Sequence, residues 1–269
     1  MLLRELPHQL RSVPKRLASS TAVVEQVQEL PDYLKFDKAR EAVLLKDYNV
    51  KITRLPNGLM VASVDTLRDV SRIGFVFKAG TRYETADTYG ITQRLRLLLG
   101  LGSDHLPVTE VGPLQGQLGA SFKTNYTREH LFLGISAPRA HSVDAVELLG
   151  ELSRPSLQNW AASDHLGDVD LEAETTLAPQ NRLIDLVHRA AYGTTGLGSP
   201  LAWPAKFIKR HPASAVRRYA ESHLVTGGGA LVGVGVDHQA LLSYATDYLR
   251  LPEAPGPKTP PSAFRGGMA

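Results

Sequence analysis

The side chains most able to do chemistry in this chain are histidines and carboxylates, because the sequence contains no cysteine. No two of the nine histidines stand four residues apart, the spacing that brings two metal ligands to one face of a helix, and His-x-His does not occur. Isolated histidines such as His188 and His223 are more often hydrogen-bonded structural residues. The Gly-x-Ser-x-Gly pattern of a serine nucleophile is absent too. These patterns predict neither a metal site nor a cofactor.

The glycines at 227–229 and at 233 and 235 are a candidate nucleotide-binding feature, since glycine lets backbone approach a phosphate. They lie before and within a predicted strand, whereas a phosphate-binding loop follows a strand and opens a helix. Close packing of the strand backbone is the better interpretation.

Composition places the chain among ordinary globular proteins, with 269 residues and 43% hydrophobic content. No apolar run approaches the roughly 18 to 20 residues that span a bilayer, so any membrane association must come through partner subunits. The net charge of +3 is concentrated at the front, where residues 1–20 hold four basic residues and one acidic residue. The remainder is close to neutral, which argues against nucleic acid as a partner.

Residues 1–20 have the composition of a mitochondrial transit peptide, being rich in Leu, Arg and Ser and poor in acid. The alternative is a disordered basic tail, because Pro7 and Pro14 interrupt the helix that a transit peptide forms. Residues 21–49 are predicted to be an extension before the fold.

The folded part is predicted to be one α+β domain over residues 50–250, a layered antiparallel or mixed sheet covered by helices. Its strongest local signal is Asn57-Gly58 between two apolar runs, which predicts a hairpin of strands at 51–55 and 59–64. Further strands are predicted at 72–79, 120–126, 130–136 and 229–236. Helices are predicted at 85–99, 108–118, 142–152, 168–176, 181–192, 214–224 and 239–249. Pro113 falls inside the predicted helix at 108–118 and weakens that prediction. Residues 251–269 are rich in Pro and Gly and are interpreted as a linker-like tail.

Several short segments together resemble the pitrilysin and processing-peptidase family, and within it the catalytically inactive core subunits of respiratory complex III. The resemblance rests on residues 53–59, 71–74, 78–84, 186–193, 197–201 and 230–236. It covers the chain from about residue 50 to its end, with a poorly matching middle from about 101 to 168. Members of the family consist of two homologous halves. Residues 264–267 resemble the start of the second half, so the chain corresponds to the N-terminal half.

Active members of this family bind zinc through His-x-x-Glu-His on the helix after the third strand. The resemblance aligns this motif with Gln93-Arg94-Leu95-Arg96-Leu97. Gln93 is a poor zinc ligand, Leu97 cannot ligate, and Arg96 places a positive charge where a carboxylate should accept a proton. The third ligand of the family is a downstream glutamate. Carboxylates occur in that region, although such a cluster is usually a solvated helix face: Asp168, Asp170, Glu172 and Glu174.

The resemblance therefore implies a degenerate metallopeptidase relative that serves as a structural subunit. It implies peripheral attachment to the matrix face of the inner mitochondrial membrane. The partners would be the other core subunit and the remaining subunits of complex III. The alternatives are a non-catalytic partner like the alpha subunit of the processing peptidase, or a diverged half-length paralogue. The residues at 93, 96 and 97 argue against an active zinc peptidase.

Overall fold

A computed structural model describes residues 49–155 and 179–266 of the chain, which belong to one compact unit, Tyr48–Ala269. The predicted transit peptide, nearly all of the predicted extension and the predicted helix at 168–176 lie outside these residues. Within the described part, no helix is long and apolar enough to cross a membrane.

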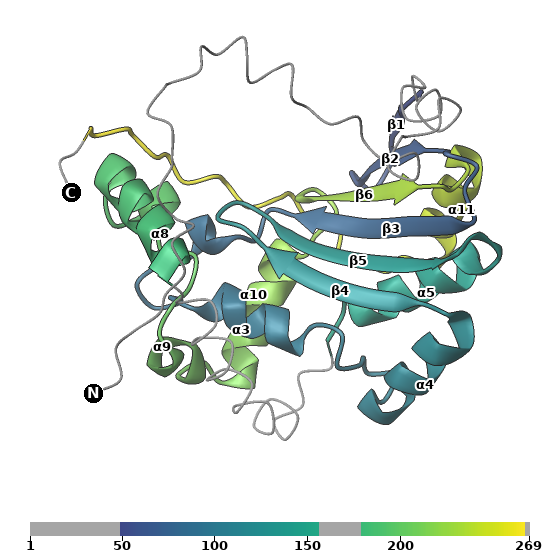
Figure 1. The fold of residues 1–269 in the computed structure, drawn as a ribbon, viewed down its shortest axis with the longest axis horizontal. Helices are drawn as coiled ribbons and strands as arrows, with labels where there is room; N and C mark the ends of the chain where they lie inside the picture. The colour runs from purple at the N-terminus through teal and green to yellow at the C-terminus, as the bar shows by residue number, and fades with distance from the viewer. Residues whose placement is uncertain (1–48, 156–178, 267–269) are drawn as a thin grey trace, which may run out of the picture. The chain divides into compact units, whose positions relative to one another are not determined.

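The centre of the fold is a six-stranded mixed sheet with the strand order β1-β2-β6-β3-β5-β4 (Figure 1). The strands are β1 Lys51–Arg54, β2 Met60–Val64, β3 Val70–Phe77, β4 Ser121–Tyr126, β5 Leu131–Pro138 and β6 Gly229–Val234. The late strand β6 lies parallel to β2 and antiparallel to β3, while every other pair is antiparallel. The predicted α+β class with a mixed sheet is confirmed.

The predicted hairpin forms as the sequence indicates. β1 and β2 pair in antiparallel register around Asn57-Gly58, where Gly58 has φ +89° and Asn57 Oδ1 accepts a hydrogen bond from the Leu59 amide. A positive φ at this turn is the reason why glycine is needed there.

The helices agree with the prediction in place and differ at some ends. They are α3 Ile91–Leu98, α4 Val108–Leu118, α5 Ser142–Leu152, α8 Pro179–Tyr192, α9 Ala205–Lys209, α10 Ala213–His223 and α11 His238–Tyr248. Helix α4 accommodates Pro113 and keeps its predicted ends. Helix α3 begins at Ile91 instead of Thr85, because Gly90 has φ +87° and cannot be part of a right-handed helix. The short helix α9 was not predicted.

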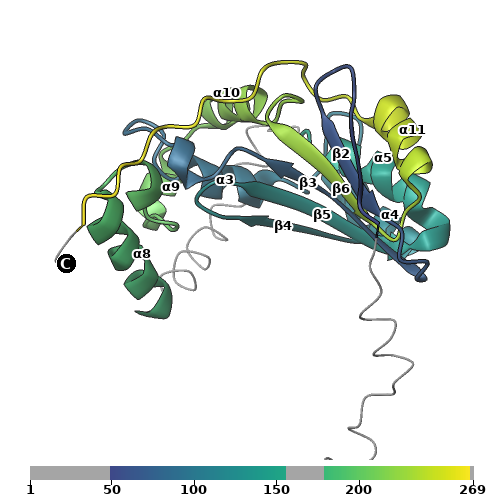
Figure 2. The same cartoon turned by 90° about the horizontal axis from the view of Figure 1, so that it is seen from above.

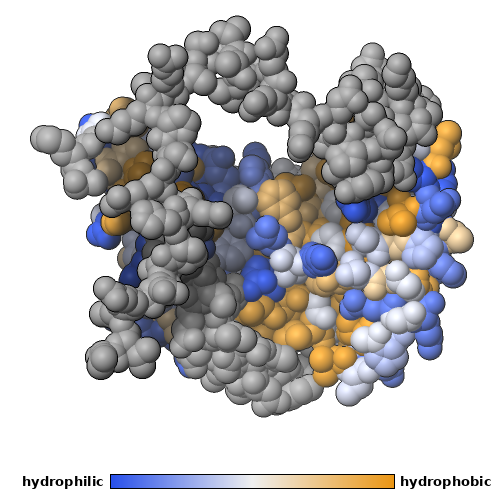
Figure 3. Space-filling model, in the orientation of Figure 1, coloured by the Kyte–Doolittle hydropathy of each residue, from blue (hydrophilic) through white to orange (hydrophobic). Residues whose placement is uncertain are grey.

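One face of the sheet is covered by helices, whereas no helix of residues 49–155 and 179–266 covers the other (Figure 2). Alternate side chains of β3 and β5 point into the core under α5 and α3, among them Phe75, Phe77 and Leu133. Figure 3 views this second face and shows apolar side chains over the sheet. Among the exposed strand residues are Met60, Val232 and Val234. Such a one-sided sheet explains the alternating sequence pattern of these strands.

The strand glycines lie where neighbouring side chains approach closely. A Cβ atom at Gly229 would be 2.7 Å from the Phe77 ring, and one at Gly233 would be 2.7 Å from Leu241. This crowding agrees with the packing interpretation of these glycines.

The Pro/Gly-rich tail contacts the domain over residues 251–266 (yellow in Figure 1). The Thr226 amide donates to the Pro252 carbonyl, and Gly227 forms an isolated bridge with Pro255. Arg82 donates two hydrogen bonds to the Pro260 carbonyl, and the Arg265 amide donates to Ala191. The tail is therefore an extended segment bound along the domain.

Candidate functional site

The predicted motif positions lie on helix α3, where Gln93, Arg96 and Leu97 share one face because they are three and four residues apart. Gln93 is fully buried, and its Oε1 accepts a hydrogen bond of 3.1 Å from the backbone amide of Trp203. Arg96 and Leu97 are half-buried. The Arg96 guanidinium lies 6.0 Å from the centre of the Tyr126 ring on β4. The helix thus presents an amide, a cation and an alkyl group.

These side chains do not fit a zinc ion. The Gln93 oxygen is already an acceptor for Trp203, Leu97 has no donor atom, and Arg96 would repel a divalent cation. In residues 49–155 and 179–266, no three His, Cys, Asp or Glu residues are grouped so that they could hold a metal. The candidate third ligands lie outside these ranges: Asp168, Asp170, Glu172 and Glu174. That Gln93, Arg96 and Leu97 correspond to the zinc motif of the family stays a prediction.

A buried carboxylate lies beside the motif positions. Glu84 is only 7% exposed and precedes α3, where Oε1 accepts from the Thr92 amide at 3.0 Å and Oε2 from the Gly90 amide at 3.1 Å. The indole Nε1–H of Trp203 also donates to Oε2, at 2.9 Å. Burial raises the pKa of Glu84 to about 7, against the opposing effect of these donors.

Glu84 belongs to a larger set of buried polar groups that joins α3 to α10. The Thr92 hydroxyl lies 3.1 Å from the hydroxyl of Tyr219 on α10, and burial raises the pKa of Tyr219. Arg94 is buried next to Gln93, and burial lowers its pKa. We call Glu84, Thr92, Gln93, Trp203 and Tyr219 the buried polar cluster. Because its side chains bond mainly to one another and to backbone, the cluster holds elements together and offers no exposed acid or nucleophile.

The two isolated histidines occupy structural positions, as the sequence pattern predicts. His223 donates from Nδ1 to the Tyr219 carbonyl at 3.0 Å and stacks on the Tyr219 ring. Burial lowers the pKa of His223. His188 donates to the carbonyl of Ile184 within α8.

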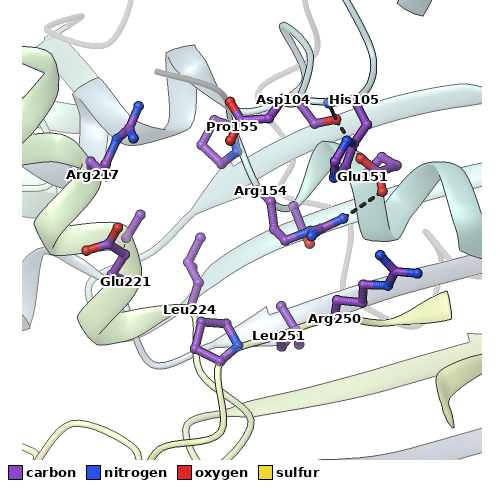
Figure 4. A pocket seen from close by; sticks show the side chains of 14 residues that line it. Asp104, His105, Glu151, Arg154, Pro155, Arg217, Glu221, Leu224, Arg250 and Leu251 are labelled. Atoms are coloured by element: carbon purple, nitrogen blue, oxygen red, sulfur yellow. Dashed lines mark hydrogen bonds and ion pairs between the residues drawn. The ribbon is translucent and has the colours of Figure 1, made fainter. Parts of the chain in front are cut away.

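A small pocket of about 220 Å³ lies between α5, α10 and the start of the tail (Figure 4). Three arginines line it, Arg154, Arg217 and Arg250, together with Asp104, Glu151 and Glu221. Arg154 points toward Glu151 and donates to Oε1 at 2.6 Å, while Ser103 donates to Oε2. The charges of this lining balance, so the pocket has no clear preference for an anion or a cation.

Sequence reasoning missed the buried polar cluster, because Glu84 and Trp203 are separated by 119 positions. It also missed a pocket of about 700 Å³ beside α8, lined by aromatic rings and by Arg182 and Arg189. One signal was present: Arg182, Leu186 and Arg189 recur at the helical spacing that puts them on one face.

Similarity to known proteins covers most of the chain. It is 28% identical to human cytochrome b-c1 complex subunit 2, mitochondrial, over 221 residues, which are 81% of this chain and 49% of the relative. The mouse protein of the same name is 26% identical over 236 residues, 87% of this chain and 52% of the relative. A probable mitochondrial-processing peptidase subunit alpha-1 of Arabidopsis thaliana is 27% identical over 281 aligned positions, 94% of this chain and 55% of the relative.

The chain thus spans about half the length of the relatives that it matches. The predicted resemblance to the core subunits of complex III, and to core protein 2 in particular, is confirmed by this similarity to cytochrome b-c1 complex subunit 2. The family model for insulinase, peptidase family M16, matches residues 60–205, which run from β2 to the start of α9 and include α3. The chain therefore belongs to peptidase family M16.

Proposed function

We propose that this chain is a non-catalytic structural subunit of the mitochondrial ubiquinol:cytochrome c oxidoreductase, complex III, which supports its assembly and stability. The similarity to cytochrome b-c1 complex subunit 2 supports the choice of complex. The observation that carries the loss of catalysis is Gln93, a buried amide held by the Trp203 backbone at the first motif position.

The domain organisation belongs to the same proposal. Residues 1–20 direct import, residues 21–49 form an extension, residues 50–250 form the peptidase-like domain, and residues 251–269 begin a second half. The protein lies peripherally on the matrix face of the inner membrane, bound to the other core subunit. The similarity to processing-peptidase alpha subunits supports a second candidate, a non-catalytic partner of a processing peptidase.

The test is expression of a tagged full-length chain in mitochondria, followed by native gel electrophoresis and identification of co-migrating proteins. Co-migration with complex III is expected, and a matched copy without residues 1–20 is expected to remain outside mitochondria. Co-migration with a processing peptidase would favour the second candidate, and a free monomer would contradict both.

The lost zinc site is tested on purified protein by metal analysis. Wild-type protein is expected to hold no stoichiometric zinc, and a chelator is expected to leave its melting temperature unchanged. A zinc metallopeptidase analysed in parallel is the positive control for metal detection, and the triple variant Gln93→His, Arg96→Glu, Leu97→His tests whether restoring the three motif side chains raises the zinc content. One tightly bound zinc ion per wild-type chain would contradict the proposed loss of the zinc site.

A further inference from the structure

The cavity of about 700 Å³ beside α8, which we call the α8 pocket, has two walls of different chemistry. One wall is aromatic and consists of Tyr89, Trp203 and Phe207. The other is a face of α8 that carries Arg182, Asp185, Leu186 and Arg189. Helices α8 and α9 lie at the same end of the unit in both ribbon views, which agrees with a pocket between them (Figures 1 and 2).

The arginines of this wall have no counter-charge in the described ranges. Within the described residues, the guanidinium groups of Arg182 and Arg189 make no hydrogen bond or ion pair. The Asp185 carboxylate between them is already paired with Arg128 and accepts from the Leu201 amide. Lys206 adds a further positive charge beside the pocket, with its Nζ 5.2 Å from the Phe207 ring centre. Unpaired guanidinium groups beside a cavity favour an anionic ligand.

The aromatic rings form a wall and leave no slot between them. Tyr89 and Trp203 stack on each other with centres 4.3 Å apart, and Trp203 also packs on Phe207 at 5.2 Å. Because the rings of Tyr89 and Phe207 both pack against Trp203, these three rings leave no slot between them in which a nucleotide base could stack. An apolar side chain can lie against such a wall, and Leu186, 54% exposed, offers it a second contact.

We propose that the α8 pocket binds an acidic peptide segment of a partner protein. Arg182 and Arg189 are seven residues apart on one helix, which places them about 10 Å apart along its axis. A peptide in the polyproline II conformation rises about 3.1 Å per residue and repeats every three residues, so acids three apart match this separation on one side. The apolar residue between them lies against Trp203 and Leu186. The pocket lining includes none of the motif positions Gln93, Arg96 and Leu97, although Trp203 contacts Gln93 through its backbone amide. The proposal does not depend on the complex III assignment.

The test uses the purified full chain with the substitution Trp160→Phe, which leaves Trp203 as its one tryptophan. A peptide with the central sequence Glu-Leu-Pro-Glu is titrated at low salt while Trp203 emission is followed, and the matched Gln-Leu-Pro-Gln peptide is the ligand control. Saturable binding of the acidic peptide alone is expected. Arg182→Gln and Arg189→Gln are each expected to weaken it about three- to tenfold.

Arg68→Gln is the protein control, because it removes an exposed arginine from the β2–β3 loop and is expected to leave binding unchanged. Circular dichroism melts of all variants separate loss of binding from loss of folding. Absence of saturable binding, equal binding of the Gln peptide, or insensitivity to both pocket substitutions would overturn the proposal. Equally tight binding of ATP or inorganic phosphate would overturn it in favour of a nucleotide or small-anion site.

Discussion

Trp203 donates its indole N–H to the carboxylate of Glu84 at 2.9 Å, and its backbone amide donates to Gln93. One residue thus bonds both to the loop that precedes α3 and to the first predicted motif position. Helix α3, predicted to correspond to the zinc-binding helix of active relatives, is fixed by hydrogen bonds to a residue just before α9.

The pH dependence of stability should reveal Glu84. Its pKa is about 7 in the folded protein and about 4.5 when unfolded, so the folded state binds more protons between these values. Its contribution to the free energy of unfolding is therefore highest below about pH 4.5, falls as the pH rises, and reaches its minimum above about 7. Urea melts measure the free energy of unfolding at pH 5 and at pH 8. Its decrease between the two pH values should be larger for the wild type than for Glu84→Gln, by on the order of 1–3 kcal/mol.

The control for this comparison is Glu253→Gln, which removes an exposed glutamate. Its free energy of unfolding is expected to change between pH 5 and pH 8 by the same amount as that of the wild type. If Glu84→Gln also showed the same change as the wild type, Glu84 would not titrate in this range.

Substitution of Gln93 should lower stability through Trp203. Gln93→Ala leaves the Trp203 amide without its acceptor and opens a cavity in a fully buried position, so a loss of about 2 kcal/mol is expected. Gln117→Ala, on the exposed surface of α4, is the matched control and should change stability by less than about 0.5 kcal/mol. Equal urea midpoints for the two variants would contradict a structural role of Gln93.

Two glycine substitutions should act in opposite directions. At Gly80 a Cβ atom would lie 2.3 Å from the Arg128 carbonyl oxygen, so Gly80→Ala must displace backbone and is expected to cost about 2 kcal/mol or more. At Gly116 on α4 no atom lies within 4 Å of an added Cβ, and Gly116→Ala should stabilise the protein by about 0.5–1 kcal/mol. Thermal melts of both variants check this pair, and a neutral Gly80→Ala would show that the β4–β5 turn can move.

The ion pair of Asp65 and Arg139 should matter at acid pH. Arg139 binds both carboxylate oxygens, at 2.7 and 2.8 Å, and the bonds lower the pKa of Asp65 to about 2. The contribution of this ion pair to the free energy of unfolding is fully present above about pH 4 and is lost as the pH falls toward 2. In Arg139→Gln the pKa of Asp65 should return toward 3.8, which carbon-detected NMR of the carboxyl group measures. An unchanged value would mean that the pair does not persist in solution.

The sequence predicts those parts of the fold that depend on neighbouring residues. The hairpin at Asn57-Gly58 and helices α4 and α5 follow from turn chemistry and apolar periodicity, which are local signals. The parallel pairing of β6 with β2 is a contact between distant segments, and no local pattern specifies which strand lies beside which. The motif positions were found by resemblance, whereas the α8 pocket needs α8 and α9 to be placed together.

The position of β6 also determines when this domain can fold. Strands β2 and β3 are separated by β6, so the middle of the sheet is incomplete until residues 229–234 have been synthesised. Until then, the apolar side chains of the first strands lack their permanent neighbours, and aggregation competes with folding. The central sheet can therefore be completed only when almost all of the domain, from β1 to β6, is present in one chain.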